Sequence, residues 1–236
     1  MNEVMRQIRE RKSVRVFEKK DVPQFVKDEI ISAALQAPTA GNMMLYTIID
    51  VTDQEIKNQL SLLCDNQPFI AKAPMVFVFL ADYQKWYDLY QAAGLSARKP
   101  GPGDLLLSCA DAIIAAQNSV VAAQSYGLGS CYIGDVLENC EQVKQLLDLP
   151  EYAVPAAMVV YGYPTKQQLE RKKPPRFQAT HIVHTNSYRK MSDEELLAMY
   201  GEQDTNESIK NIYERKYTSE FALEMNRSAS EYLGKF

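Results

Sequence analysis

Hydrophobic and polar positions along the 236-residue chain alternate between strand-like and helix-like patterns. Two nearly continuous apolar runs, residues 74–81 and 153–163, are rich in β-forming residues and predict strands buried on both faces. Shorter runs at 44–51 and 131–135 predict two further strands. Helices are expected over 3–12, 23–38, 55–63, 109–126, 139–147 and 206–233, and after Ser192. This alternation indicates an α/β or α+β domain.

The helix over 109–126 is apolar nearly all round. Such a helix is normally buried all round, so it is expected at the centre of the fold or at the seam of a dimer. Capping boxes are expected where Asn139 precedes Gln142 and where Ser192 precedes Glu195.

Two segments between these elements are expected to be loops. Residues 38–42 contain proline, glycine and asparagine, and residues 82–107 are aromatic and then rich in basic residues, glycine and proline. We predict a mobile loop over 82–107. Its aromatic residues could form a lid over a substrate, or they could simply pack at a surface or interface.

Composition and charge narrow the class of protein. The net charge of −4 does not favour a nucleic-acid or anionic-membrane partner. The charged N-terminus lacks the apolar stretch of a signal peptide, and the longest apolar run, 75–81, is too short to span a membrane. The four cysteines show no CxxC spacing, which favours reduced thiols. We therefore expect a cytoplasmic protein.

Several familiar chemistries are missing from the sequence. The glycines at 127, 129 and 134 have the wrong spacing for a dinucleotide fingerprint, and they precede a strand instead of opening a helix. His181 and His184 have no nearby acid or cysteine to complete a metal site, so they are interpreted as structural. There is no nucleophile elbow of the GxSxG type. We expect no catalytic side-chain pair and no metal.

Two basic segments could bind an anion. Arg11 and Arg15 would share one face of a helical turn, where a phosphate between them would offset their repulsion and Ser13 would add a hydroxyl donor. Residues 172–176 form a second basic segment after a predicted strand. The alternative for each segment is a solvated basic surface.

Two further segments could contact a planar ligand. Gly41 would allow close backbone approach and Asn42 would supply donors, unless residues 39–42 merely stop a helix. Gln67, within the segment 66–69, could hydrogen-bond the edge of a heterocycle, or the segment could be an ordinary turn.

Taken together and in this order, these segments resemble the nitroreductase family. The resembling stretches are 11–17, 37–42, 66–69, 126–134, and 173–176 with 184–188. The resemblance implies an α+β fold with a central, mostly antiparallel sheet wrapped by helices. It also implies an interlocked homodimer with FMN sites at the interface, an FMN-binding domain over 1–190, and a C-terminal helical extension over 191–236 that packs on the other subunit.

The resemblance also implies roles for individual residues. The cofactor-binding set is Arg11, Lys12, Ser13, Arg15, Gln67, Tyr132, Ile133, Gly134, Lys173 and Arg176. Arginines, lysines and Ser13 would hold the FMN phosphate and ribityl chain, Gln67 the ring edge, and the 132–134 backbone the ring near its reactive nitrogen. Asn42 is a candidate for substrate contact, and the charges of Arg98 and Lys99 suggest contact with the 2′-phosphate of NADPH.

The implied activity is a ping-pong cycle in which NADPH or NADH delivers hydride to FMN. A nitroaromatic, a quinone or free flavin then takes the electrons. A non-catalytic flavin carrier and another reductive reaction on the same fold remain as alternatives, while the missing fingerprint disfavours a dehydrogenase of the nucleotide-binding type.

Overall fold

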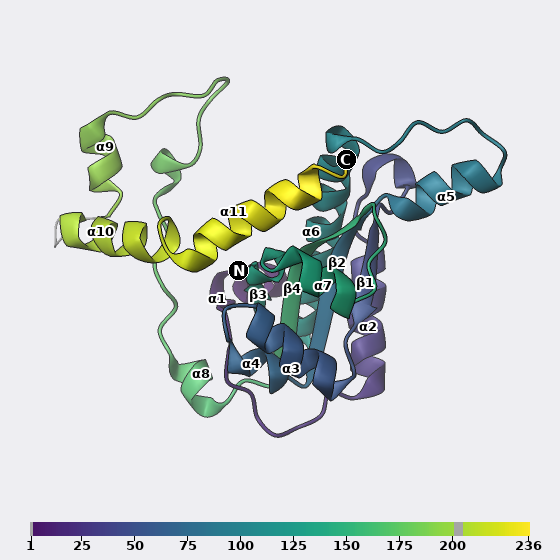
Figure 1. Ribbon diagram of the computed structural model, residues 1–236. Coiled ribbons are helices and arrows are strands. Elements are labelled where there is room, and N and C mark those ends of the chain that lie inside the picture. The colour runs from purple at the N-terminus through teal and green to yellow at the C-terminus, as the bar shows by residue number, and fades with distance from the viewer. Residues whose placement is uncertain (1, 201–204) are drawn as a thin grey trace. The chain divides into compact units, whose positions relative to one another are not determined.

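A computed structural model describes residues 2–200 and 205–236 and places an antiparallel sheet at the centre (Figure 1). The strands are β1 (Tyr46–Asp50), β2 (Met75–Asp82), β3 (Gly129–Ile133) and β4 (Ala153–Gly162), in the spatial order β1-β2-β4-β3. Each neighbouring pair is antiparallel. The α+β class and the antiparallel sheet are thus confirmed.

Helices cover both faces of this sheet (Figure 1). On one face, Phe77, Phe79 and Tyr161 pack with α2 (Gln24–Leu35) and α6 (Pro102–Ser125). On the other, Val78 and Val160 pack with α3 (Gln54–Leu63), α4 (Pro68–Ala71) and α7 (Cys140–Leu146). Because successive side chains of a strand point to opposite faces, a strand covered on both sides must be apolar throughout. The two predicted doubly buried strands are β2 and β4.

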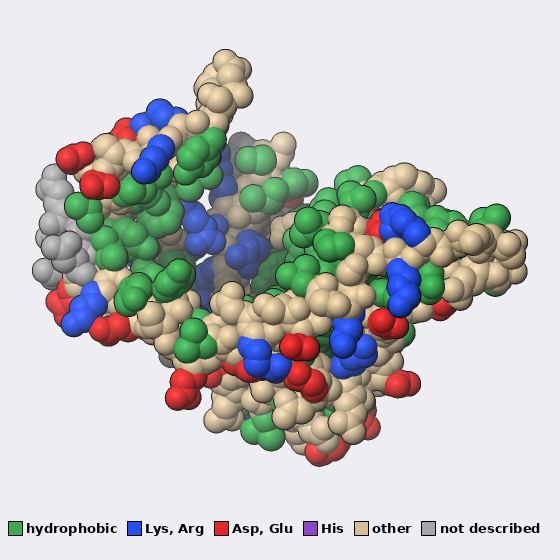
Figure 2. Space-filling view, turned by 45° about the horizontal axis from the view of Figure 1, so that its top comes forward, with side chains coloured by type: hydrophobic (Ala, Val, Ile, Leu, Met, Phe, Trp, Pro, Cys, Tyr) green, Lys and Arg blue, Asp and Glu red, His purple; other side chains and the backbone are tan. Residues whose placement is uncertain are grey.

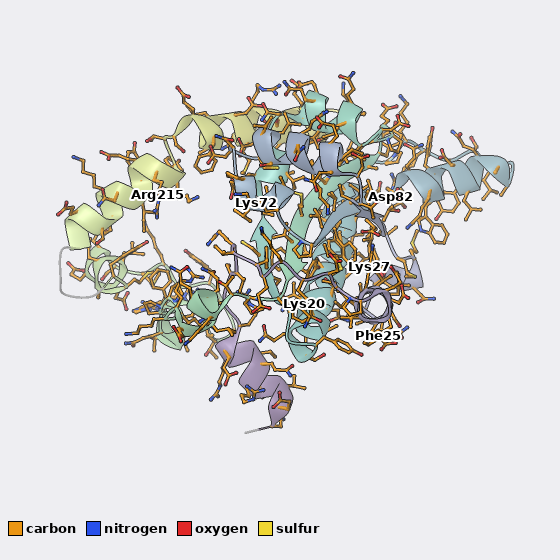
Figure 3. The ribbon with its side chains drawn as sticks, turned by 90° about the horizontal axis from the view of Figure 1, so that it is seen from below. Lys20, Phe25, Lys27, Lys72, Asp82 and Arg215 are labelled. Carbon is orange, nitrogen blue, oxygen red and sulfur yellow. The ribbon has the colours of Figure 1, made fainter. Side chains whose placement is uncertain are left out.

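The other helices of the described residues are shorter or peripheral. They are α1 (Glu3–Glu10), η1 (Ala40–Asn42), α5 (Gln84–Ala92), η2 (Asp135–Leu137), α8 (Lys166–Glu170), η3 (Ala179–His181), α9 (Asp193–Ala198), α10 (Thr205–Lys216) and α11 (Glu220–Leu233). Lys27 on α2 pairs with Asp50 at the end of β1 and ties the helix layer to the sheet (Figure 3).

The chain divides into two compact units. Unit 1 comprises the chain up to Arg171 together with Glu224–Phe236, and unit 2 is Lys172–Leu223. The segment 191–236 is therefore shared between the units. Its last part is held to α7 of unit 1, where Arg227 forms a 2.8 Å ion pair with Glu141.

The mobile loop predicted over 82–107 was wrong for much of its length. Residues 84–92 form α5, and α6 begins at Pro102. Trp86 fixes α5 by donating a 2.8 Å hydrogen bond to the carbonyl of Met43. Asp104 caps α6 through the backbone N–H of Gly101 at 2.8 Å, which makes the glycine- and proline-rich stretch a helix start.

Two predictions near helix ends also failed. The helix predicted over 206–233 is interrupted between Lys216 and Glu220. There the hydroxyls of Thr218 and Ser219 bond to carbonyls of the preceding turn and compete with its continuation. The capping box of Asn139 is absent, because Asn139 donates its amide to the carbonyl of Leu63 at 2.8 Å. The box of Ser192 with Glu195 is confirmed.

Helix α6 is not buried all round within one chain. Its alanines 112, 115, 116 and 123 are fully buried against the sheet and α2, whereas Leu106 is 67% and Ile113 42% exposed. The helix is long and apolar enough to cross a membrane, yet it contacts all four strands as a core helix does. An apolar face of α6 is left uncovered. The four cysteines are free thiols, as predicted.

Candidate functional site

Residues 11–15 run along the outer side of edge strand β3. Ser13 forms a parallel bridge with Ser130, and the N–H of Val14 donates to the carbonyl of Ser130 at 2.9 Å. Helix α1 ends at Glu10, so the helical turn expected for Arg11 and Arg15 was wrong. An extended segment places alternate side chains on one side. Arg11, Ser13 and Arg15 therefore share a side even though they are not on a helix.

This pairing depends on a close approach between Val14 and Gly129. Val14 is 4% exposed, and a Cβ added to Gly129 would lie 2.5 Å from its Cγ2 atom. Only glycine at position 129 leaves room for the side chain of Val14. The chain continues past the site with a second bridge, Phe17 to Pro164, and Lys20 lies with its Nζ 3.9 Å from the ring centroid of Tyr163 (Figure 3).

The three side chains meet around Cys131 of β3. Burial raises the pKa of the Cys131 thiol, while the nearby Arg15, a hydrogen bond from Ser13 and the charge of Arg11 oppose that rise. Arg15 also lies 5.8 Å from the ring centroid of Phe69 on α4. Nη1 of Arg11 is buried without a hydrogen-bond partner. A buried cationic nitrogen without a partner is costly, so an anion held here would be stabilising.

Gln67 joins this site at the end of β3. Its Nε2 donates to Asp135 Oδ2 and to the carbonyl of Cys64, both at 2.9 Å. Asp135 directly follows the predicted segment 132–134, in which Ile133 is buried and Gly134 is exposed with open space beside it. Burial raises the pKa of Tyr132 to about 12. Three segments singled out in the sequence, 11–15, 66–69 and 132–134, thus converge on one place.

Lys12 points away from this convergence. Its Nζ donates to the carbonyl of Leu169 at 2.7 Å and also to that of Arg171. Arg171 in turn donates from its guanidinium to the carbonyl of Ser13. These contacts hold residues 11–15 in place against residues 169–171. Arg171 was missed as a site residue, although it opens the basic stretch that the sequence shows before Lys172.

Asn42 does not reach this place within one chain. It precedes β1, which lies at the opposite edge of the sheet from β3, about 14 Å away for three strand spacings. Its loop is fixed by buried Asp111, which accepts hydrogen bonds from the N–H groups of Ala40 at 3.0 Å and Leu45 at 3.1 Å, and from the hydroxyl of Thr39.

The remaining predicted residues lie elsewhere in the chain. Arg98 forms an ion pair with Asp104 at 2.6 Å, and Lys99 beside it is exposed. Lys173 and Arg176 belong to unit 2, so their part in the site stays a prediction. The aromatic segment forms a cavity of about 300 Å³ lined by Tyr83, Tyr87, Tyr90, Leu95, Ala97 and Arg98.

The fold and the site define an α+β protein with a cluster of cationic side chains at a sheet edge. Residues 8–163 match the model of the nitroreductase family, so the chain belongs to that family. It is 30% identical to a Cr(VI) reductase of Pseudomonas sp. (strain G-1), over 93% of this chain and 92% of the relative. It is 33% identical to an FMN reductase (NADPH) of Bacillus subtilis, over 82% and 78% of the two chains.

A solved structure extends these similarities to the fold. The NADPH:FMN oxidoreductase of Vibrio harveyi, solved as a complex with NAD⁺, superposes with a TM-score of 0.79 at 27% identity and covers 98% of both chains.

Proposed function

We propose that the chain transfers electrons from NADPH or NADH, by way of FMN, to a small planar acceptor such as a nitroaromatic, a quinone or free flavin. The family makes the chain an oxidoreductase with FMN as its cofactor. The observation that carries the proposal is the cationic cluster beside β3, in which a buried guanidinium nitrogen of Arg11 has no partner.

The residues present fit a phosphorylated flavin. Arg11, Ser13 and Arg15 share one side of an extended segment and would hold the phosphate and ribityl chain. Gln67 would meet the ring edge, and the 132–134 backbone would lie along the ring. Lys173 and Arg176 of unit 2 are proposed as further phosphate ligands. When bound, FMN supplies hydride acceptance and onward electron transfer.

The chain's own residues would bind and orient FMN and leave its ring accessible to the electron donor and acceptor. Gly134 is exposed with no atom near an added Cβ, which leaves room for a planar molecule next to the site. We propose that donor and acceptor use this room in turn, as a ping-pong cycle requires. Arg98 and Lys99 are proposed contacts for the 2′-phosphate of NADPH, and the cytoplasm is the proposed location.

A homodimer would complete the site. The exposed apolar face of α6 is joined by α1, on which Val4, Met5 and Ile8 are each at least 40% exposed. Unit 2 also presents hydrophobic side chains at its surface (Figure 2). Among its residues, Val183 is 69% and Leu197 47% exposed. Apolar surface of this kind marks interaction sites. A second chain would bring Asn42 to the cluster of the first, and residues 191–236 are proposed to contact that partner.

The proposal is tested by comparing FMN with riboflavin, which lacks the phosphate. Replacing Arg11 with methionine removes a charge-assisted hydrogen bond of about 1.5–3 kcal/mol, so FMN affinity should fall roughly 10- to 100-fold. Riboflavin affinity should stay the same, and Lys19→Met, at an exposed position, should change neither. An equal loss for both flavins, or no loss for FMN, would contradict the assignment of Arg11 to the phosphate.

A further inference from the structure

The cavity of about 300 Å³ in the aromatic segment is formed by α5 and by the chain that returns along it. Three of its lining residues recur at a spacing that puts side chains on one side of a helix, namely Tyr83, Tyr87 and Tyr90. Gly94, with a φ of 72°, lets the chain reverse directly after α5. The N–H of Leu95 then bonds back to the carbonyl of Tyr90 at 2.9 Å. The reversal brings residues 95–98 to the cavity that the tyrosines line.

The tyrosine wall is held by contacts outside the cavity. Tyr87 packs edge-to-face on Tyr152, with ring centroids 5.4 Å apart, and Tyr90 packs on Trp86 at 5.9 Å. The N–H of Tyr83 donates to the carbonyl of Tyr152 at 3.1 Å. Rings fixed in this way need little reordering when a ligand enters, and tyrosine rings favour a flat aromatic ligand.

Arg98 and Lys99 bring positive charge to this cavity. The guanidinium of Arg98 uses Nη1 and Nη2 on the two carboxylate oxygens of Asp104, at 2.6 and 3.0 Å, yet its side chain is 71% exposed. A guanidinium held along one edge by a carboxylate still presents its flat face, and that face stacks on aromatic rings. Lys99, the next residue, is exposed and carries a second charge. The arrangement suits an aromatic ring with an anionic group beside it.

The cavity is joined to the loop that carries Asn42. From α5, Trp86 donates to the carbonyl of Met43 at 2.8 Å, and Lys85 donates to the carbonyl of Tyr46 at 2.6 Å. A second chain that brings Asn42 to the FMN of the first therefore brings this cavity with it. A ligand in the cavity is then within the neighbourhood of the flavin of the other subunit.

The protein walls of the cavity distinguish between kinds of ligand. An electron acceptor and the nicotinamide of the donor must both lie against the flavin to react. A ring enclosed by protein side chains is instead a part that does not react. NADPH contains such a ring, its adenine, and carries a phosphate on the adjoining ribose.

We propose that this cavity binds the adenine ring of NADPH, with the ring stacked on Arg98 among the tyrosines and the 2′-phosphate bound by Lys99. The inference rests on the proposed function, because the cavity serves turnover only if the nicotinamide of the same molecule reaches FMN. It separates the roles of the two cations: Arg98 binds the ring and Lys99 the phosphate. It also makes NADPH the preferred donor, since NADH has no 2′-phosphate.

The experiment titrates the FMN-loaded protein with adenosine 2′,5′-bisphosphate and with AMP in a calorimeter. Both probes contain adenine and lack nicotinamide, and only the first carries the 2′-phosphate. The bisphosphate should bind about tenfold more tightly, as one charge-assisted hydrogen bond provides. Lys99→Met should remove this difference and leave AMP affinity unchanged. Lys19→Met, at an exposed position, is the matched control and should bind both probes as the unaltered chain does.

Two further variants test the ring site. Arg98→Lys keeps the charge but loses the flat face, so it should weaken both probes by about tenfold. Ala97→Phe places a ring in the cavity that Ala97 lines and should abolish the binding of both probes without changing FMN affinity. The KM for NADPH should rise in both variants, while the KM for the acceptor should not change.

The outcomes separate this inference from the proposed function. A protein that binds no FMN, or whose FMN neither nicotinamide reduces, would overturn the proposed function itself. If NADPH reduces the FMN but Arg98→Lys keeps the affinities and the KM of the unaltered chain, the cavity does not bind adenine. Equal binding of the bisphosphate and AMP to the unaltered chain would overturn the role of Lys99. Because Arg98 is exposed, this variant tests the site even if Ala97→Phe fails to fold.

Discussion

Replacing Gly129 with alanine should remove residues 11–15 from β3. The new Cβ would lie 2.5 Å from Cγ2, 2.8 Å from Cβ and 3.0 Å from Cγ1 of Val14. Val14 cannot move aside alone, because its N–H is bonded to Ser130 and it is almost fully buried. The strain must be relieved by displacing the segment that carries Arg11, Ser13 and Arg15.

The magnitude follows from these contacts. Overpacking a well-filled site costs about 1–3 kcal/mol of the free energy of unfolding. Misplacing the arginines costs FMN at least one charge-assisted hydrogen bond of about 1.5–3 kcal/mol, or roughly 10- to 100-fold in affinity. Gly129→Ala should therefore lower the free energy of unfolding, measured by urea denaturation, and the affinity for FMN, measured by fluorescence titration.

Two further variants sharpen this prediction. Val14→Ala removes both Cγ atoms, so the double variant with Gly129→Ala should recover part of the lost FMN affinity relative to Gly129→Ala alone. Gly103→Ala, where an added Cβ meets nothing within 4 Å, is the matched control and should not weaken FMN binding. If Gly129→Ala loses stability but binds FMN normally, the segment beside β3 does not hold the cofactor.

Other consequences follow from buried groups outside this segment. Asp111→Ala leaves three donors of the 39–45 loop without their acceptor and should destabilise the protein by about 3–5 kcal/mol in urea, and a loss below about 1 kcal/mol would refute this role. Burial raises the pKa of Glu138 from its ordinary value of 4.5 to about 7, so the stabilising contribution of its bound proton is full below pH 4.5 and is lost as the pH rises through about 7. Glu138→Gln should thus gain stability relative to the unaltered chain at pH 8, by on the order of 1–3 kcal/mol, and an equal difference at pH 5 and pH 8 would contradict this. A thiol reagent should modify four cysteines in the denatured protein but react slowly with the native one, mainly at half-buried Cys109.

The sheet was predictable because a strand that is buried on both faces is apolar along nearly its whole length. The runs at 74–81 and 153–163 are β2 and β4, the central strands, and their apolar residues serve both layers of helices. The segment 82–107 was misjudged because glycine, proline and aromatic residues resemble loop composition. In α5 the aromatic side chains instead make tertiary contacts, such as Trp86 to Met43, that the local sequence does not reveal.

Much of the candidate site was also predictable, since residue types and spacing mark anion-binding segments. Arg11, Ser13 and Arg15 do share one side, but through strand pairing with β3 and not through a helical turn. Arg171 was not identified, because its role depends on a contact with Ser13, which is distant in the sequence. Asn42 precedes the strand at the far edge of the sheet, away from the cluster, which its position in the sequence does not reveal.

The measurement that tests the central claim most directly is an anaerobic visible spectrum of the purified protein with FMN, before and after separate additions of NADPH and NADH. We predict a yellow protein that one or both nicotinamides bleach rapidly and that a quinone or nitroaromatic then reoxidises. A protein that binds FMN but is bleached by neither would be a flavin carrier or use another electron source. A protein that is colourless after incubation with excess FMN and removal of the unbound FMN by gel filtration would contradict the account.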